Sequence, residues 1–318
     1  MDILIVLAYN EQLNLEKCIL KNIETFDRVL VVNDKSTDKT AEILEKLSNK
    51  FEKISVITNK KNFGPGKSLN IGMREALKYN PELIIKIDGD NQFKPDNIRE
   101  IQQLAKDNSS DFIKCDRFWP EGIQGDIPKI RFFGNAFASL LIKAVTGNWN
   151  ITDPLNGLFV FSNKVAKEIS IPKFFNRYGY PYFINLTVSK YNIKNPINLH
   201  QYKNTITYAN ESSKLSPFGV FVKLIGYSFV HFISTIKTKL QFSNYQISGL
   251  IDIGAVFVFL SSFISFYMFI ISRYFQYPGN QHTWFLLFIV SIVLFIVLML
   301  QSHKSMKTEN DESFKYLN

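Results

Sequence analysis

Cysteine and acidic side chains are scarce in this chain, and their scarcity limits what the protein can be. Its 318 residues include two cysteines, Cys18 and Cys115, and neither lies in a CxxC pair. The sequence therefore indicates no disulfide framework and no zinc site, and it favours a reducing compartment for the soluble part. Asp and Glu total 28 against 37 Lys and Arg, which gives a formal net charge of +9. That excess suits anionic lipid, phosphorylated substrates or nucleic acid.

The sequence also lacks nucleic-acid-binding motifs and the features of a signal peptide. The sequence has no zinc knuckle and no RNA-binding aromatic signature, so we expect no nucleic-acid partner. The first residues, Met1-Asp2-Ile3-Leu4, lack a basic region and lead directly into a strand-like run, so we expect no cleavable signal peptide. The length leaves room for about two units of roughly 150 residues each.

Charge is missing altogether from two long segments near the C-terminus. Residues 253–271 and 283–300 hold no charged side chain, and the first is rich in Phe, Val and Ile. A spanning helix needs about 20 apolar residues. We therefore predict a transmembrane helical hairpin within residues 246–301, with helices at about 250–272 and 283–300. A buried core helix is the competing interpretation, which two such runs in succession disfavour.

Basic residues flank the predicted hairpin on both sides. They are Lys237 and Lys239 before it and Lys304 and Lys307 after it, whereas the linker region offers Arg273. The positive-inside rule then places both ends of the hairpin in the cytoplasm. Residues 302–318 are predicted to form a polar cytoplasmic tail, which we expect to be disordered from residue 308 onward.

Acidic residues are also absent between Glu211 and Asp252, where lysines accompany many apolar residues. We interpret residues 216–245 as a basic amphipathic juxtamembrane segment that lies on anionic lipid. A third membrane span over residues 217–236 is the alternative. It would move either the tail or the N-terminal part to the other side of the membrane, so topology distinguishes the two interpretations.

Residues 1–115 alternate short strand-like runs with helical patterns. The strands are predicted at residues 3–8, 28–32, 54–58 and 83–87. Such alternation predicts an α/β fold, with a Rossmann-like, mostly parallel sheet and helices on both faces. The carboxyl ends of parallel strands meet at one edge, where ligands bind. The residues expected to meet there are Asn10, Asp34, Gly64 and Asp88. Residues 116–212 are expected to complete the sheet and cover the site.

The run Asp88-Gly89-Asp90-Asn91-Gln92 directly follows the apolar segment 83–87. Its two carboxylates and its Gln92 amide oxygen are hard donors of the kind that Mg²⁺ or Mn²⁺ takes together with substrate phosphates. An Asx-rich turn between strand and helix, helped by Gly89, is the structural alternative. This motif by itself leaves both interpretations open.

Five short motifs follow one another along the first two thirds of the chain. They are Leu7-Ala8-Tyr9-Asn10-Glu11, Val31-Val32-Asn33-Asp34-Lys35-Ser36-Thr37-Asp38, Asn62-Phe63-Gly64-Pro65-Gly66-Lys67-Ser68, Asp88-Gly89-Asp90-Asn91-Gln92 and Asp153-Pro154-Leu155-Asn156-Gly157. In this order they resemble the family 2 glycosyltransferases of the GT-A fold. More narrowly, the chain is similar to the dolichol-phosphate mannose synthase and polyprenyl-phosphate glycosyltransferase branch. The resemblance covers about residues 1–215, which we therefore interpret as a cytoplasmic GT-A catalytic domain.

The chain departs from the family pattern at two positions. Leu7 stands where proline is usual, and Asn33 replaces the first of two adjacent acids, which leaves the base preference open. The third motif is not a P-loop, because Lys61 occupies the position where a P-loop requires glycine. Asp38 is expected to cap the following helix.

The resemblance implies a nucleotide-sugar site built from these motifs. Its expected residues are Leu7, Tyr9, Asn10, Glu11, Asp34, Lys67, Asp88, Gly89 and Asp90. The resemblance also implies a Mg²⁺ or Mn²⁺ cofactor held by Asp88, Asp90 and Gln92. Such a cation stabilises the negative charge of a leaving nucleoside diphosphate.

The resemblance also implies an acceptor side. The residues expected to bind the acceptor phosphate are Arg117, Arg131 and Lys214, and the expected catalytic residues are Asp90, Asp153 and Arg131. Arginine binds phosphate in a forked geometry, although an exposed surface arginine is the alternative for both. A hydroxyl acceptor would need Asp153 as general base, whereas a lipid phosphate is already ionised and needs none. Relatives carry acids near Asn185, and this chain does not, so no base is expected from that helix.

These expectations combine into an inverting, metal-dependent glycosyltransferase, a multi-pass protein of the cell membrane with its catalytic domain in the cytoplasm. It would move a sugar from a nucleotide-diphosphate sugar to polyprenyl phosphate at the cytoplasmic face. The alternative enzyme transfers the sugar to a hydroxyl of a lipid-linked saccharide in cell-surface polysaccharide assembly. The non-enzymatic alternative is a non-catalytic GT-A membrane module. An oligomer is compatible with each, and the sequence does not name the sugar, the base or the polyprenol.

Overall fold

A computed structural model describes residues 1–119, 122–124, 129–207, 217–275, 280–306 and 314–317. The chain divides into two compact units. The sheet unit comprises Met1–Ile142, Asn150–Tyr227 and Glu312–Asn318, and the helical unit comprises Lys143–Trp149 and Ser228–Asp311. The uncharged runs fall in the helical unit, and the alternating strand and helix patterns fall in the sheet unit.

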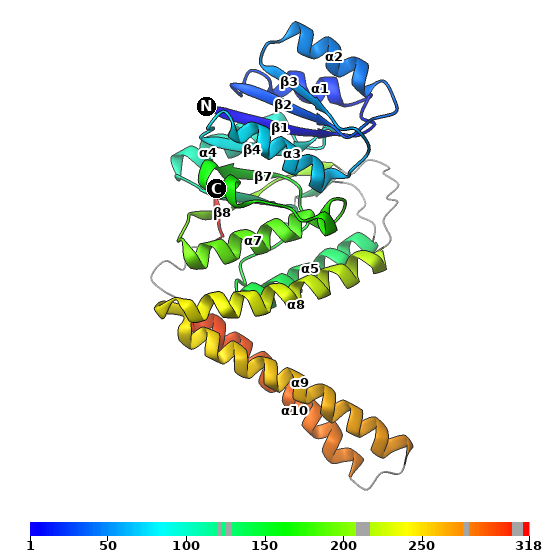
Figure 1. Ribbon diagram of the computed structural model, residues 1–318, viewed down its shortest axis with the longest axis vertical. Coiled ribbons are helices and arrows are strands. Elements are labelled where there is room, and N and C mark those ends of the chain that lie inside the picture. The colour runs from blue at the N-terminus through cyan, green and yellow to red at the C-terminus, as the bar shows by residue number, and fades with distance from the viewer. Residues whose placement is uncertain (120–121, 125–128, 208–216, 276–279, 307–313, 318) are drawn as a thin grey trace. The chain divides into compact units, whose positions relative to one another are not determined.

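The sheet unit is built on an eight-stranded sheet in the order β10-β8-β5-β7-β4-β1-β2-β3 (Figure 1). Its strands are β1 (Asp2–Ala8), β2 (Arg28–Asn33), β3 (Ile54–Thr58), β4 (Leu83–Asp88), β5 (Phe112–Asp116), β7 (Phe159–Ser162), β8 (Leu199–Lys203) and β10 (Lys315–Leu317). All neighbouring strands pair in parallel except β7, which runs antiparallel between β4 and β5. The predicted mostly parallel sheet is therefore confirmed. A separate pair joins β6 (Ile123–Gln124) to β9 (Ile206–Thr207).

Helices cover both faces of this sheet, as predicted. Those whose apolar residues join the core of one face are α1 (Leu15–Asn22), α2 (Thr40–Lys50) and α4 (Pro95–Asp107). The other group includes α3 (Pro65–Leu77), α6 (Asn163–Glu168), the short helix η1 (Lys173–Phe175) and α7 (Tyr180–Lys194). The central strand β1 is buried along its whole length, as expected of a strand covered on both sides.

The alternation of side chains along β4 and β5 decides which polar groups reach the α7 face. Successive strand residues point to opposite faces. The isoleucines on either side of Lys86 join the core beneath α1 and α4, whereas Lys86 contacts Tyr180 of α7. Asp88, two residues later, shares the face of Lys86. On β5 the same spacing places Lys114 and Asp116 on one face, so each of these strands carries a buried lysine two residues before an aspartate at its carboxyl end.

The helical unit contains an antiparallel pair of long helices, α9 (Gln246–Tyr274) and α10 (Gln281–Ser305), preceded by the short helix η2 (Ser243–Tyr245). The contacts between them run from Ser248 with Ser302 (2.8 Å between hydroxyls), through Phe259 with Phe295 (5.0 Å between ring centroids), to Phe269 with Phe285 (5.2 Å). The predicted helical hairpin is therefore confirmed. Each helix begins earlier and ends later than the sequence pattern indicated.

In this hairpin the small and polar side chains are buried and the large apolar side chains are exposed, which is the reverse of a helix pair in a soluble protein. The buried residues of α9 are small or polar: Ser248, Gly249, Asp252, Ala255, Ser262 and Ser265. Large apolar side chains on the same helix are exposed, among them Phe257 at 69 % and Ile264 at 63 %. Small residues allow close approach between helices in lipid, and an apolar exterior of this extent suits a lipid environment.

Three described helices are long and apolar enough to cross a membrane. Two are the hairpin helices, and the third spans residues 219–241 within α8 (Pro217–Gln241). Length and composition therefore do not decide whether α8 crosses the membrane or lies on its surface. A buried ion pair joins the end of α8 to the start of α9, with 2.6 Å between Lys239 Nζ and Asp252 Oδ2. Lys239 is thus balanced by an acid within the fold.

The expectation of a disordered tail is wrong for its last described residues. Lys315–Leu317 form strand β10, which extends the sheet beside β8, and Phe314 is buried against the Phe112 ring. The tail carries too few residues for a strand pattern to be recognised in the sequence. The strand forms because β8 offers an unpaired edge, and that edge exists only once the sheet has assembled.

Candidate active site

The strand ends bring the first, second and fourth motifs together. Leu7 on β1 lies opposite Asp88 on β4, and Ala8 lies opposite Asn33 on β2. The chain leaving each strand is tied to its neighbour by backbone hydrogen bonds: Gly89 N–H donates to Leu7 O and Asp34 N–H donates to Ala8 O, both at 2.9 Å. The predicted gathering of polar residues at one sheet edge is therefore confirmed for these motifs.

Side-chain hydrogen bonds lock the first motif to the second. Asn10 has a φ of 60°, a conformation that asparagine tolerates better than most residues. Its backbone N–H donates to Ser36 Oγ at 3.0 Å, and its side-chain oxygen accepts from Thr37 N–H at 2.8 Å. Glu11 N–H donates to Thr40 Oγ1 at 2.9 Å. Tyr9, directly after β1, stays 45 % exposed.

Asp34 joins the second motif to the glycine-rich third motif. It is 4 % exposed, and its Oδ2 accepts from Gly64 N–H at 2.7 Å, while Oδ1 accepts from Asn59 Nδ2 at 2.7 Å and Phe63 N–H at 2.9 Å. Gly64 has a φ of +94°, which requires glycine, and Lys67 lies half-buried in the first turn of the following helix α3. The Asp34 carboxylate therefore shapes the turn that leads to Lys67.

Two further side chains of the second motif support its turn. Asn33, which replaces an acid of the family pattern, accepts from Ser36 N–H at 3.0 Å and from Ser36 Oγ at 2.7 Å. Asp38 accepts from Thr40 N–H, the first residue of α2, at 3.0 Å. The N-cap residue of α2 is Lys39, and no side chain caps the helix from that position, so the prediction that Asp38 is the cap residue is wrong. Asp38 instead binds the first helical N–H from one residue earlier.

Asp88 is held by a buried lysine. Lys86 Nζ lies 2.7 Å from Asp88 Oδ1 and donates to the Tyr180 hydroxyl at 2.7 Å. The Lys86 side chain is fully buried, whereas the Asp88 side chain is 36 % exposed. Gly157, in the fifth motif, allows this arrangement because a Cβ there would lie 2.9 Å from Asp88 Oδ2. One carboxylate oxygen is thus fixed from beneath, and the side chain keeps a solvent-facing surface.

The electrostatics around Asp88 keep Lys86 charged. Burial by itself would lower the pKa of Lys86, but the Asp88 carboxylate and the Tyr180 hydroxyl raise it above its ordinary value. Burial raises the pKa of Tyr180 to about 12, so its hydroxyl remains protonated at neutral pH. Burial also raises the pKa of the nearby Cys18 thiol to about 12, with the charges of Asp90 and Asp88 acting in the same direction. Cys18 is therefore an inert thiol beside a cluster of negative charge.

The residues after Asp88 form a turn that carries the second carboxylate. Asp90 Oδ1 accepts from Gln92 N–H at 3.1 Å, and Asn91 has a φ of 59°. Among the described residues, no group of three or more His, Cys, Asp or Glu side chains is placed to hold a metal ion. The donors present at this turn are two carboxylates and one amide oxygen. This set fits Mg²⁺ or Mn²⁺, which commonly takes one or two carboxylates and completes its shell with substrate phosphates and water.

Asp153 and Arg117 form a bidentate ion pair. Arg117 Nε and one terminal nitrogen donate to the two Asp153 oxygens at 2.7 and 2.8 Å, and Arg117 N–H donates to Oδ2 at 3.0 Å. Asp153 is buried and has a φ of 40°. Burial raises its pKa, but the adjacent guanidinium outweighs burial and holds the pKa below the ordinary value. Asp153 is therefore an ionised partner of Arg117, with its oxygens already engaged.

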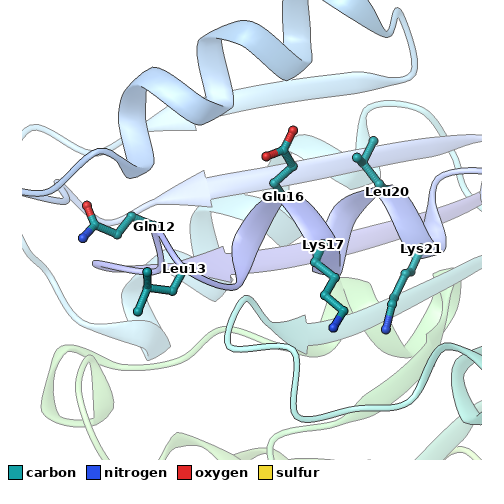
Figure 2. A pocket seen from close by; sticks show the side chains of 6 residues that line it. All are labelled: Gln12, Leu13, Glu16, Lys17, Leu20 and Lys21. Atoms are coloured by element: carbon teal, nitrogen blue, oxygen red, sulfur yellow. The ribbon is translucent and has the colours of Figure 1, made fainter.

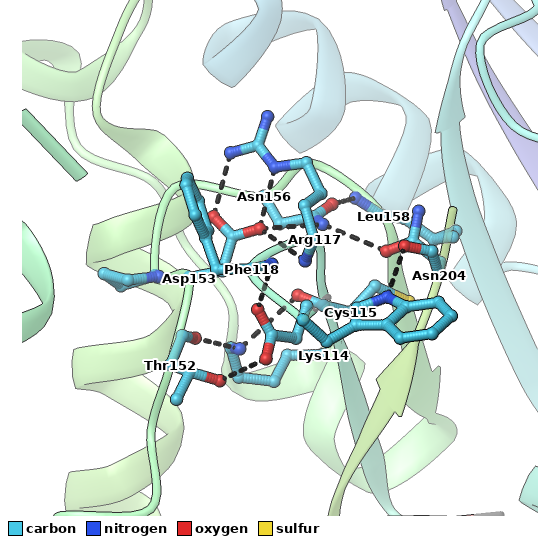
Figure 3. A network of polar contacts seen from close by, with 12 residues as sticks. Lys114, Cys115, Arg117, Phe118, Thr152, Asp153, Asn156, Leu158 and Asn204 are labelled. Atoms are coloured by element: carbon cyan, nitrogen blue, oxygen red, sulfur yellow. Dashed lines mark hydrogen bonds and ion pairs between the residues drawn. The ribbon is translucent and has the colours of Figure 1, made fainter. Parts of the chain in front are cut away.

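A buried polar network supports this ion pair (Figure 3). Lys114 Nζ donates to Thr152 O and to Gln201 Oε1, the latter at 3.1 Å. Thr152 Oγ1 donates to Asp116 Oδ2 at 2.8 Å. Burial lowers the pKa of Lys114. The network links β5, β8 and the segment before Asp153, and so it fixes the backbone from which both members of the pair project.

The remaining predicted residues lie apart from these contacts or outside the described part. Arg131 lies in α5 (Lys129–Thr146), and its side chain is outside the described residues. Lys214 is also outside them. Asn185, on α7, donates to Pro154 O at 3.3 Å, so this side chain helps position the fifth motif.

A shallow depression on α1 holds none of the predicted site residues. It is lined by Gln12, Leu13, Glu16, Lys17, Leu20 and Lys21 (Figure 2). Gln12 and Leu13 precede α1, the other four side chains lie on the helix, and Figure 2 shows no convergence toward a shared point. The depression is therefore surface relief, and the strand ends remain the candidate active site.

Sequence reasoning missed Lys86, Tyr180 and Lys114 as parts of this site. A signal was present in each strand, because a lysine inside an otherwise apolar buried run is rare unless it is paired. The strand pattern indicates the burial of the lysine, but the partner of Lys86 on α7 is 94 residues away in sequence.

Gly157→Ala should destabilise the protein. The new Cβ would lie 2.9 Å from Asp88 Oδ2 and 3.1 Å from buried Lys86 Nζ, so these groups must shift. We expect a loss of about 1–3 kcal/mol, measured as a lower thermal unfolding midpoint in detergent. Gly226→Ala is the matched control, because Gly226 is exposed and no described atom lies within 4 Å of a Cβ there. Equal midpoints for the two variants would contradict the close contact.

Comparison with known proteins gives the family of the chain. The model of glycosyl transferase family 2 matches residues 3–170. An uncharacterized protein of Methanocaldococcus jannaschii is 32 % identical over 197 residues, 59 % of this chain and 82 % of the relative. A UDP-N-acetylglucosamine–dolichyl-phosphate N-acetylglucosaminyltransferase of Methanococcus voltae is 26 % identical, over 52 % of this chain and 71 % of the relative. A dolichyl-phosphate beta-glucosyltransferase of Trichomonas vaginalis is 29 % identical, over 48 % of this chain and 46 % of the relative.

Solved structures resemble the chain in fold. Glucosyl-3-phosphoglycerate synthase from Mycobacterium tuberculosis, in complex with UDP, superposes with a TM-score of 0.53 at 16 % identity, over 72 % of this chain and 80 % of that protein. A second structure of that enzyme contains Mn²⁺ and UDP-glucose and has a TM-score of 0.52 at 14 % identity, over 73 % and 78 %. These likenesses agree with a GT-A fold. Because the family model covers more than half of its residues, the chain belongs to glycosyl transferase family 2.

Proposed function

We propose that this protein transfers a sugar from a nucleotide-diphosphate sugar to polyprenyl phosphate at a membrane, with inversion at the anomeric carbon. The observation that carries the proposal is the pair of carboxylates at the end of β4, with Asp88 fixed by Lys86, in a chain that also carries an apolar helical hairpin. Two relatives are named for transfer to dolichyl phosphate, which supports a lipid phosphate as the acceptor.

The donor would lie across the ends of β1, β2 and β4. Tyr9 is exposed there for stacking on the base, and the Asp34-supported turn presents Lys67 near phosphate. Leu7, Asn10, Glu11 and Gly89 are the remaining proposed donor residues. Asp88, Asp90 and Gln92 would hold Mg²⁺ or Mn²⁺, and a bound cation supplies positive charge that stabilises the leaving diphosphate. Lys86 keeps the Asp88 carboxylate in one orientation before any substrate arrives.

The acceptor phosphate would meet Arg117, with Arg131 and Lys214 as further cationic partners. Asp153 supports Arg117 through the bidentate pair and does not act as a base. A phosphate oxygen of the ionised acceptor attacks the anomeric carbon directly, and the bond from that carbon to the diphosphate oxygen breaks. The nucleoside diphosphate leaves with the bonding electrons, so the reaction needs no proton transfer. A hydroxyl acceptor would instead require a base with a pKa near the working pH, and the pKa of Asp153 lies too low.

The position of strand β10 in the sheet limits how many times the chain can cross the membrane. The chain leaves the sheet unit through α8 and returns to the same sheet at Lys315–Leu317. Both ends of the intervening segment therefore lie on one side of the membrane, and the number of crossings between them is even. With α9 and α10 crossing, α8 lies along the surface, where its lysines meet anionic lipid. The basic flanks support a cytoplasmic position for the sheet unit at the cell membrane.

Asp90→Ala should abolish transfer. The purified protein is assayed with polyprenyl phosphate, a panel of nucleotide sugars and Mg²⁺ or Mn²⁺. We expect a mild-acid-labile glycosyl phosphate lipid from the wild type, and a rate at least about 100-fold lower from the variant, because a charge-stabilising contact is lost. Asp96→Ala is the control, since the Asp96 side chain is 93 % exposed in the first turn of α4. An acid-stable product would favour the hydroxyl acceptor, and unchanged turnover in Asp90→Ala would refute the proposed role of Asp90.

Asp153→Asn should weaken acceptor binding without changing the pH profile. The pKa of Asp153 is held below the ordinary value of 3.8, so the carboxylate is ionised above about pH 4. Its stabilising pair with Arg117 is present above that range and is lost only as the pH falls through the lowered pKa. We expect the acceptor KM to rise about tenfold, with parallel profiles of kcat/KM from about pH 5 to 8 for both proteins. A loss confined to kcat, of about 100-fold or more, would indicate a general base instead.

Membrane topology can be tested with single introduced cysteines. Both native cysteines are buried, so an impermeant thiol reagent should report the new site. We expect Ser243→Cys and Lys315→Cys to be labelled from the cytoplasmic side, and Asn280→Cys from the opposite side. If α8 crossed the membrane together with α9 and α10, Ser243→Cys and Lys315→Cys would both be labelled from the non-cytoplasmic side and Asn280→Cys from the cytoplasmic side, and the even number of crossings would be wrong.

A further inference from the structure

The strand that follows the membrane hairpin is built firmly into the catalytic sheet. In β10, Tyr316 lies opposite Gln201 of β8. Phe314, just before the strand, donates its N–H to Leu199 O at 2.7 Å, and its carbonyl accepts from Gln201 Nε2 at 2.8 Å. Its ring is 1 % exposed and lies 6.3 Å from the Phe112 ring, measured between centroids. These contacts position Tyr316 independently of its hydroxyl group.

The Tyr316 hydroxyl joins two segments of the candidate acceptor site. It donates to Asp116 Oδ2 and lies 3.0 Å from Thr152 Oγ1. Thr152 Oγ1 in turn donates to the same Asp116 oxygen at 2.8 Å. Burial and the hydrogen bond to Asp116 raise the pKa of Tyr316 above its ordinary value, so the hydroxyl keeps its proton at neutral pH. The Tyr316 ring lies 5.2 Å from Lys203 Nζ, which supports its orientation.

Tyr316 contacts two residues, and each of them comes immediately before one member of the ion pair in the sequence. Asp116 precedes Arg117, and Thr152 precedes Asp153. The other Asp116 oxygen accepts from Phe118 N–H at 2.9 Å, so the Asp116 side chain spans the backbone that carries Arg117. The hydroxyl of Tyr316 therefore joins the residue before Arg117 to the residue before Asp153, next to the contacts between Arg117 and Asp153.

We infer that Tyr316 is a positioning residue for Arg117, so that the chain segment after the membrane hairpin completes the acceptor-phosphate side of the active site. This inference rests on the proposed function, because it assigns Arg117 to the acceptor phosphate. Tyr316 belongs to the chain segment that follows the apolar helices in the sequence. The donor side, at the ends of β1, β2 and β4, should not depend on Tyr316, since its hydrogen bonds come from other elements.

Tyr316→Phe removes the hydroxyl and keeps the ring. The matched control is Tyr79→Phe, because Tyr79 is similarly exposed (38 % against 36 %) and its ring also faces a cation, Arg28, at 4.3 Å. The Tyr79 hydroxyl makes no hydrogen bond to a described residue. Three quantities are measured for each full-length protein in detergent: amide hydrogen exchange of Arg117 and Phe118, the KM values for polyprenyl phosphate and for the nucleotide sugar, and the thermal midpoint.

For Tyr316→Phe we expect faster exchange at Arg117 and Phe118 and an acceptor KM raised about tenfold, as for the loss of one hydrogen bond to a charged group. The donor KM, the midpoint and all values for Tyr79→Phe should stay close to wild type. Unchanged exchange with unchanged acceptor KM would overturn the inference. An equal rise in both KM values with a lower midpoint would also overturn it, because that pattern marks general destabilisation.

The exchange measurement separates this inference from the proposed function. If the wild type forms no glycosyl phosphate lipid with any donor, the proposed function fails. Faster exchange at Arg117 in Tyr316→Phe would then still support the tie between Tyr316 and the Arg117 segment, and unchanged exchange would still refute it.

Discussion

Positive charges fixed beside two carboxylates are the feature on which the candidate active site depends. Lys86 lies 2.7 Å from Asp88, and Arg117 binds both oxygens of Asp153. Taking such charges out of water costs several kcal/mol per ion, and the cost is recovered only when the partner is close and hydrogen bonds satisfy the rest. Tyr180 is the second partner of Lys86, and Asn156 is the second partner of Asp153. They supply those hydrogen bonds. The carboxylates consequently hold their orientation without a ligand, which reduces the reorganisation needed when charge develops during a reaction.

The same condition, that polar groups in apolar surroundings must be paired, organises the helical unit. Its small and hydroxyl-bearing residues face inward, its large apolar residues face outward, and its one buried acid, Asp252, is paired with Lys239 within the described residues. In the sheet unit the pairing of charges orients side chains at the candidate site, whereas in the helical unit it joins the end of α8 to the start of α9. The chain returns to the sheet at β10, so segments on either side of the helical unit in the sequence belong to the same sheet unit.

Much of the fold could be predicted from sequence because its signals are local. Alternating strand and helix patterns indicate a parallel sheet, parallel strands share a carboxyl edge, and two uncharged runs indicate a hairpin. The placement of Asp34 and Asp88 at that edge follows directly. Their partners do not, because hydrogen bonds such as those that Gly64 donates to Asp34 and Lys86 donates to Tyr180 join residues 30 and 94 positions apart. The contact of Tyr316 with Asp116 spans 200 positions and depends on a strand too short to be recognised in the sequence.

The sequence by itself determined the class of the protein: an α/β domain with family 2 motifs in order, followed by apolar helices. These properties depend on residue types and on their spacing along the chain. The tertiary structure decided what each charged residue does, making Asp153 an engaged partner of Arg117, Lys86 the support of Asp88, and residues 315–317 a strand of the sheet. The physical reason is that the state of a buried charge depends on the groups within hydrogen-bonding distance, and distant parts of the chain supply those groups only after folding.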